Sequence, residues 1–138
     1  MSGYKRLLLA IDFSPATPDV LEIGTSWAEA FKARLDLVHV CALGGQGEPD
    51  AESALAALKL PGQGAALVDS RLVFRALSPD LGLLQLARDR HADLIVMGTH
   101  GRSGLQHIRL GSTAERVVQL AECPVLTVRR PDFSYQSP

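Results

Sequence analysis

Apolar runs alternate with amphipathic segments along the chain. The run over 6–11 is continuously apolar, which is typical of a strand buried on both faces of a parallel sheet. Further strands are predicted over 35–40, 71–77, 94–97 and 125–128, of which 71–77 alternates only imperfectly. Because helical segments separate them, the pattern predicts an α/β fold: a single-domain, open, five-stranded parallel sheet with helices on both faces.

The segments between the runs carry helix-start signals. Thr17-Pro18 and Ser78-Pro79 each place a capping residue before a proline, which suits the N-cap and first position of a helix. Trp27 falls on the apolar side of the first helix and is expected in the core. The Ala- and Leu-rich segment 51–60 predicts a short helix between two Gly- and Pro-rich loops. A last helix is expected over 113–121.

Composition narrows the class of protein. A length of 138 residues, 46% of them hydrophobic, fits one domain over 1–130 followed by a loose tail over 131–138. A net charge of -1 argues against a general nucleic-acid binder. No apolar run approaches the roughly 18 residues that cross a bilayer, and no leader is visible, so we expect no membrane partner and a cytoplasmic location. Cys41 and Cys123 lack metal-ligand spacing and are expected to be apolar fillers.

The segment from 98 to 113 is the most informative for function. It joins an apolar strand to a helix start and holds four glycines but no acidic residue. Four basic or titratable side chains add a local positive field: His100, Arg102, His107 and Arg109. The first N–H groups of a helix lack intrahelical partners and favour an anion. The segment therefore predicts a phosphate site.

Structural roles compete with binding at several of these positions. Ser112 and Glu115 form an S-x-x-E capping box, which needs no ligand to explain it. The glycines of the segment suit a plain strand-to-helix turn. Asp12 suits an Asx turn or an N-cap. His39, within an apolar strand, is expected to be a hydrogen-bonded core histidine.

The segment also resembles a known signature. Gly98, Gly101 and Gly111-Ser112 follow the spacing Gly, two residues, Gly, nine residues, Gly-Ser. This resembles the nucleotide-binding signature of the universal stress protein family, in its ATP-binding branch. Four further segments resemble the family in chain order: Ala10–Ser14, Leu37–Val40, Ala92–Gly98 and Cys123–Val128. The resemblance implies the strand order 3-2-1-4-5 and a homodimer formed through the strand over 125–128.

The resemblance also implies the contents of a site. The ligand would be ATP (or AMP or ADP), with Mg²⁺ or Mn²⁺ held through the phosphates. Phosphates would bind at Gly101, Arg102, Gly111, Ser112 and Thr113, and the nucleotide would also contact Gly98 and Thr99. Asp12 would bind a ribose hydroxyl or help to place a metal, while Ala10, Val40 and Met97 would frame the adenine. Ligands of such sheets bind outside the carboxyl ends of the strands, where the strand order reverses.

Three functions remain open. The first is a regulatory nucleotide-binding module in the stress response. The second is a slow ATPase or phosphotransferase, for which only Asp12, His100 and His107 are candidate bases. The third is a dimeric interaction protein that binds no nucleotide. The chain lacks the P-loop G-x-x-x-x-G-K-[ST], a glycine fingerprint after its first strand and a G-x-S-x-G elbow.

Overall fold

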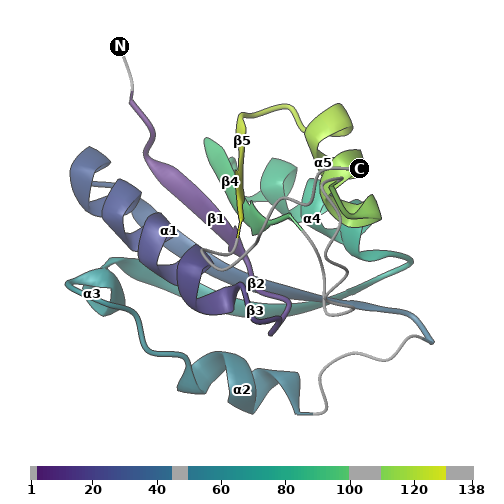
Figure 1. The fold of residues 1–138 in the computed structure, drawn as a ribbon, viewed down its shortest axis with the longest axis horizontal. Helices are drawn as coiled ribbons and strands as arrows, with labels where there is room; N and C mark the ends of the chain where they lie inside the picture. The colour runs from purple at the N-terminus through teal and green to yellow at the C-terminus, as the bar shows by residue number, and fades with distance from the viewer. Residues whose placement is uncertain (1–2, 45–49, 100–109, 130–138) are drawn as a thin grey trace, which may run out of the picture.

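The sheet has the predicted architecture. A computed structural model describes residues 3–44, 50–99 and 110–129, and the expected tail over 131–138 lies outside them. Five parallel strands run in the order β3-β2-β1-β4-β5, which confirms the expected order (Figure 1). They are β1 (Arg6–Ala10), β2 (Arg34–Ala42), β3 (Val68–Ala76), β4 (Leu94–Gly98) and β5 (Val125–Val128).

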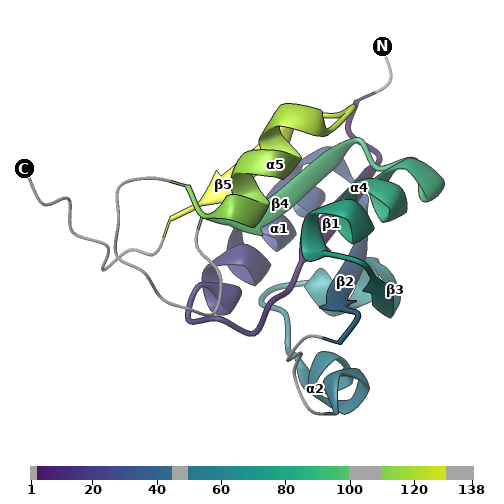
Figure 2. The same ribbon diagram turned by 90° about the vertical axis from the view of Figure 1, so that its right-hand side faces the viewer.

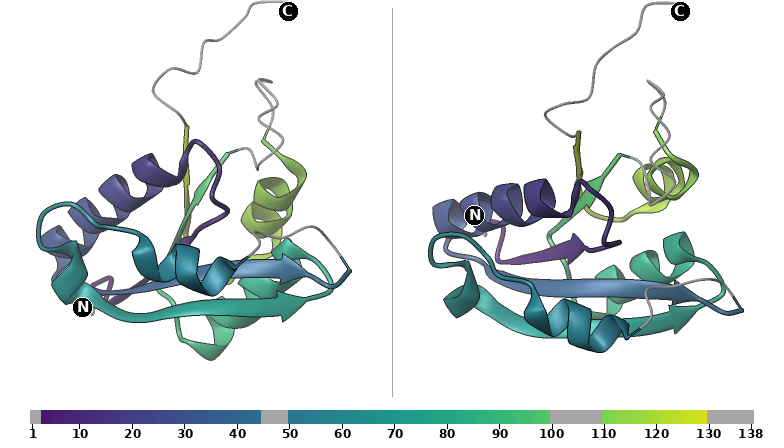
Figure 3. Two further views of the ribbon diagram at one scale, coloured as in Figure 1. Left: turned by 90° about the horizontal axis from the view of Figure 1, so that it is seen from below. Right: turned by 60° about the horizontal axis from the view of Figure 1, so that its bottom comes forward.

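Helices cover both faces of this sheet. Within the described ranges they are α1 (Thr17–Phe31), α2 (Ala51–Ala57), α3 (Gly64–Leu67), α4 (Pro79–Asp89) and α5 (Ser112–Leu120). Figure 2 shows α4 and α5 in front of the sheet and α1 behind it. The short helix α2 lies alongside β2 and β3, as Figure 3 shows from two sides. No helix in the described part of the chain is long and apolar enough to cross a membrane.

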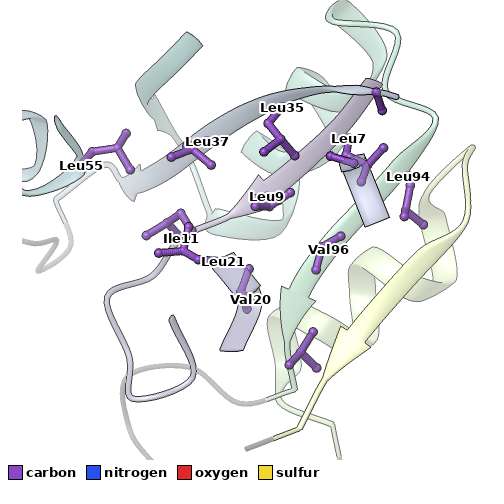
Figure 4. Close-up of a cluster of buried hydrophobic side chains, with 13 residues drawn as sticks. Leu7, Leu9, Ile11, Val20, Leu21, Leu35, Leu37, Leu55, Leu94 and Val96 are labelled. Carbon is purple, nitrogen blue, oxygen red and sulfur yellow. The ribbon is translucent and has the colours of Figure 1, made fainter. Parts of the chain in front are cut away.

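The central strand β1 supplies both halves of the core. Leu7 and Leu9 face α1 and belong to a cluster that also contains Leu55 of α2 (Figure 4). Leu8 points to the opposite face and packs with residues of α4 and α5. All three β1 leucines are fully buried. This double burial explains why the strand reads as one uninterrupted apolar run.

The region before β3 departs from expectation. The strand begins at Val68 rather than 71, the short helix α3 precedes it, and α2 ends at Ala57 rather than 60. Arg71 of β3 explains where α2 stops, because its Nη1 donates to the carbonyls of Leu55, Ala56 and Leu58 at 2.7 to 3.0 Å. A guanidinium on a helix C-terminus satisfies its last carbonyls and its dipole.

Two of the expected helix caps are wrong by one residue. The N-cap of α1 is Ala16 rather than Thr17, whose side chain is buried in the first turn. The N-cap of α5 is Gly111, so Ser112 is the first helical residue and makes no capping hydrogen bond. The Ser112–Glu115 capping box therefore does not form, because a side chain inside the first turn no longer lies over the free N–H groups. Ser78 does hold the N-cap position of α4.

A buried carboxylate joins the amino-terminal half of the sheet to α4. Asp36 of β2 has a fully buried side chain. It accepts hydrogen bonds from Arg6 of β1 (3.0 Å), Ser70 of β3 (2.6 Å) and Arg90 at the end of α4 (3.0 and 3.1 Å). Burial acts to raise the pKa of Asp36, but the hydrogen bonds from Arg90, Ser70 and Arg6 outweigh it and hold the pKa below its ordinary value.

The substitution Asp36→Asn should therefore destabilise the protein. It leaves two guanidinium groups facing a neutral amide, and we expect the free energy of unfolding at pH 7 to fall by about 2 kcal/mol. The folded pKa lies below the unfolded value of roughly 3.9. The contribution of Asp36 is thus fully present above the unfolded pKa and is lost as pH falls through the folded pKa. Urea unfolding should show the gap between wild type and variant narrowing only below about pH 4.

The matched control is Asp69→Asn. Asp69 binds the same Arg6 at 3.0 Å, but its side chain is 31% exposed. Its removal should cost less, because water remains available to its partners. Equal losses from the two substitutions would contradict the role assigned to the buried carboxylate.

Candidate functional site

The carboxyl ends of β1 and β4 lie next to each other at the point where the strand order reverses. Leu9 pairs with Val96 at the end of the β1–β4 ladder. The next residues along the two strands, Ala10 and Met97, are therefore neighbours across this edge. Both side chains belong to the core face covered by α4 and α5. Val40 of β2 lies on the same face, so the three residues expected to frame a base share one side of the sheet.

Two main-chain hydrogen bonds bring β4, β5 and α5 together. The N–H of Thr99 donates to the carbonyl of Val128 at 3.1 Å, and the N–H of Gly111 donates to the carbonyl of Thr99 at 2.6 Å. The second bond joins the two ends of the segment that follows β4, which sets the start of α5 beside the end of β4. Gly101 and Arg102, expected to bind phosphate, lie outside the described residues with the rest of 100–109.

The start of α5 presents a helix N-terminus at this edge. Gly98, at the end of β4, and Thr113, in the first turn of α5, are half-buried, and Ser112 is exposed. Glu115 N–H donates to the Gly111 carbonyl at 2.9 Å and so makes the first intrahelical bond. The N–H groups of the helix that precede it have no intrahelical partner, and such groups favour an anion.

Asp12 forms the tight turn that follows β1. Its Oδ1 accepts a hydrogen bond from the N–H of Ser14 at 2.9 Å, which confirms the Asx turn. Ser14 Oγ in turn accepts from the N–H of Ala16 at 3.3 Å, at the start of α1. Phe13 between them adopts a positive φ of 58°. Asp12 Oδ2 has no partner in the described part of the chain, so this carboxylate has both a structural oxygen and a free one.

His39 is a core histidine, as its place in an apolar strand predicted. Its side chain is 4% exposed, and its Nδ1 lies 2.7 Å from the carbonyl oxygen of Ile11. The ring of Phe13 packs against the imidazole with 4.9 Å between centroids. Periodicity indicated only that His39 is buried; its partner lies 28 residues earlier in the chain, and no local signal in the sequence identifies it.

Gly82 is a second residue that the sequence did not single out. A Cβ atom at this position of α4 would lie 2.5 Å from Cγ1 of Val40. Only a glycine lets the helix lie this close to β2 without moving the Val40 side chain. The missing side chain therefore sets the distance between α4 and the expected base-binding strand.

The opposite edge of the sheet holds a separate cavity of about 370 Å³. It lies at the amino ends of β4 and β5, away from the residues described above. Its lining comes from the ends of α4 and α5 and the links to the strands: Leu84, Ala87, Arg88, His91, Ala92, Asp93, Leu120, Ala121, Glu122 and Cys123. Partial burial raises the pKa of the Cys123 thiol, which favours its protonated form. Cys41 and Cys123 are both free thiols.

Comparison with known proteins identifies the family. The model of the universal stress protein family matches residues 3–129, and the chain belongs to this family. Universal stress protein A homolog 1 of Coxiella burnetii is 33% identical, with 91% of this chain and 96% of that protein aligned. A universal stress protein of Thermus aquaticus is 34% identical, with 91% and 99% aligned.

Solved structures agree on the fold. Universal stress protein UspA from Lactobacillus plantarum superposes with a TM-score of 0.76 at 24% identity, covering 94% of this chain and all of that one. A universal stress protein from Archaeoglobus fulgidus, solved in complex with dAMP, gives 0.67 at 23% identity, with 92% and 98% covered. A third universal stress protein, solved in complex with cAMP, gives a TM-score of 0.70 at 23% identity, covering 93% of this chain and 98% of that one.

Substitutions at Asp12 separate its structural oxygen from its free one. Asp12→Ala removes the acceptor for the Ser14 N–H, and we expect the free energy of unfolding to fall by about 1 kcal/mol. Asp12→Asn retains an acceptor at Oδ1 and should stay within about 0.5 kcal/mol of wild type. Urea unfolding measures both, and an Asn variant as unstable as the Ala variant would contradict the turn assignment.

Proposed function

We propose that this protein is a regulatory module of the stress response that binds ATP (or AMP or ADP) at the carboxyl edge of β1 and β4. The observation that supports it most is the hydrogen bond from Gly111 N–H to the Thr99 carbonyl, at 2.6 Å. It sets the N-terminus of α5 beside the reversal of strand order, where α/β sheets bind ligands. A helix N-terminus there suits a phosphate.

The residues of this edge suit the parts of a nucleotide. Backbone N–H groups of Ser112 and Thr113 would bind phosphates, with Gly111 as the N-cap that places them, joined by Gly101 and Arg102. Gly98 and Thr99 would contact the nucleotide where β4 ends. Asp12 Oδ2 would accept a hydrogen bond from a ribose hydroxyl. Ala10, Val40 and Met97 would frame the base from the face that they share.

A divalent cation would bind chiefly through the phosphates. The free carboxylate oxygen of Asp12 is a hard ligand of the kind that Mg²⁺ or Mn²⁺ prefers. Within residues 3–44, 50–99 and 110–129, no cluster of three or more His, Cys, Asp or Glu side chains is arranged to hold a metal ion. The metal would neutralise phosphate charge when bound.

Related structures support the ligand class. The Archaeoglobus fulgidus protein was solved with dAMP and another family member with cAMP, and both share the fold described here. Both ligands contain adenine, a pentose and a phosphate, which are the parts that the edge of β1 and β4 suits.

The substitution Gly101→Val tests the phosphate site. A β-branched side chain would occupy the space beside the backbone N–H groups and resist the required backbone conformation. We expect ATP affinity, measured by calorimetric titration, to weaken by roughly tenfold or more. Gly3→Val is the matched control, because a Cβ at Gly3 meets nothing within 4 Å. A folded Gly101→Val variant with unchanged affinity would refute the assigned site.

We further propose that the protein forms a homodimer through the strand over 125–128. β5 is an edge strand paired only with β4, and exposed edges favour pairing with a second copy. The carbonyls of Pro124 and Val128 face β4, where they accept from Ile95 and Thr99. By the alternation of a strand, the main-chain groups of Val125 and Thr127 face outward.

The substitution Thr127→Pro tests this edge. It removes an outward N–H without touching the ladder to β4, a position where a strand tolerates proline. We expect sedimentation velocity at micromolar concentration to change from dimer to monomer, with the fold intact. Thr127→Val keeps the N–H and should remain dimeric. A wild-type monomer, or an unchanged dimer of the proline variant, would contradict the proposal.

A further inference from the structure

The main-chain groups of successive residues of β2 point alternately toward β1 and toward β3. Arg34 N–H donates to the Lys5 carbonyl at 2.9 Å, and the Val38 carbonyl accepts from Ile11 N–H at 2.8 Å. Even-numbered residues of β2 therefore direct their main-chain groups toward β1. Leu43 N–H, in contrast, donates to the Ala76 carbonyl of β3 at 2.8 Å. Val40 thus faces the β1 side.

β1 ends before it can pair with Val40. β2 has nine residues and β1 has five. In a ladder continued by one step, the Val40 N–H would donate to the carbonyl of Ile11. Within the described residues, no backbone hydrogen bond joins Val40 to Ile11. In the same part of the chain, no backbone hydrogen bond joins Phe13 N–H to the Val40 carbonyl either, and the chain turns at Phe13, which has a positive φ of 58°.

The Ile11 carbonyl is satisfied by a side chain instead. His39 Nδ1 lies 2.7 Å from this oxygen. Because a carbonyl only accepts, Nδ1 carries the proton and donates. The ring is 4% exposed and packs on Phe13, which fixes its orientation. A buried carbonyl must find a donor, and here the imidazole supplies the donor that the main chain of β2 would otherwise provide.

We propose that His39 is a positioning residue of the nucleotide site. Its imidazole donates a hydrogen bond to the Ile11 carbonyl in place of the Val40 N–H, and so leaves the main chain of Val40 free to bind the edge of an adenine. That edge presents an acceptor nitrogen beside an amino donor, complementary to the N–H and C=O of one extended residue. The inference rests on the proposed function and adds the residue that keeps the base contact available.

Amide hydrogen exchange, followed by NMR, tests this without any nucleotide. In the wild-type protein the Val40 amide should exchange faster than the amide of Val38, which lies within the ladder, and ATP should protect it. His39→Leu removes the donor while keeping a buried side chain of similar size. In this variant the Val40 N–H should turn to the Ile11 carbonyl and become protected without nucleotide.

Binding measurements complete the test. His39→Leu should weaken the affinity for ATP by roughly five- to tenfold, which is the effect of one lost hydrogen bond. Inorganic triphosphate has no base and should bind both proteins equally. His39→Asn, whose Nδ2 can replace Nδ1 as donor, should restore exchange at Val40 and ATP affinity. A structural role alone would affect both ligands alike.

The possible outcomes are distinct. Protection of the Val40 amide in nucleotide-free wild type equal to that of Val38 overturns the inference, as does unchanged Val40 exchange in a folded His39→Leu variant. Failure of wild type to bind ATP refutes the proposed function and the base contact together. The exchange data then still decide whether His39 replaces the Val40 N–H.

Discussion

The burial of β1 on both faces is the constraint on which the rest of the structure depends. Leu7, Leu8 and Leu9 are each 0% exposed. A strand so placed needs a parallel neighbour on each side and helices above and below. Because all five strands are parallel, their carboxyl ends meet at one edge. The helices that follow them begin at the same edge and bring free N–H groups to it.

Strands of unequal length give that edge its chemistry. A backbone group inside the ladder is already paired, whereas one beyond the end of its neighbour is available to a ligand or must be satisfied by other means. β2 has nine residues and β1 has five, and β2 extends four residues beyond the end of β1. The turn at Asp12 and the ring of His39 close the end of β1 with side chains instead of main chain.

Ion pairs and hydrogen bonds join the strands in the amino-terminal half of the sheet. Asp36 lies between Arg6 and Arg90 and binds Ser70, which joins β1, β2, β3 and the end of α4 in one network. This network lies toward the amino ends of the strands. The network therefore lies away from the edge where a ligand would bind, and the carboxyl edge consists of loops and helix starts, where binding residues usually lie.

Much of the fold could be predicted from periodicity and capping signals. The strands over 94–97 and 125–128 lie within or match the observed ones, and the turn at Asp12 forms as its residue type indicates. The start of β3 and the helix α3 were not predicted. The end of α2 was also misplaced, because it depends on hydrogen bonds from Arg71, a residue of β3 that lies beyond the helix in the chain. Both misplaced caps differ by one residue, since several neighbouring residues can fill an N-cap.

The sequence by itself determined that the run forming β1 is buried, where the glycine-rich segment lies and which family signature it resembles. Only the tertiary structure decided which carbonyl the ring of His39 reaches and how closely α4 approaches Val40 across Gly82. The physical reason is that burial leaves a periodic trace in the chain. The partner of a main-chain group at a strand end depends on where the neighbouring strand stops, and that is set only when distant segments come together.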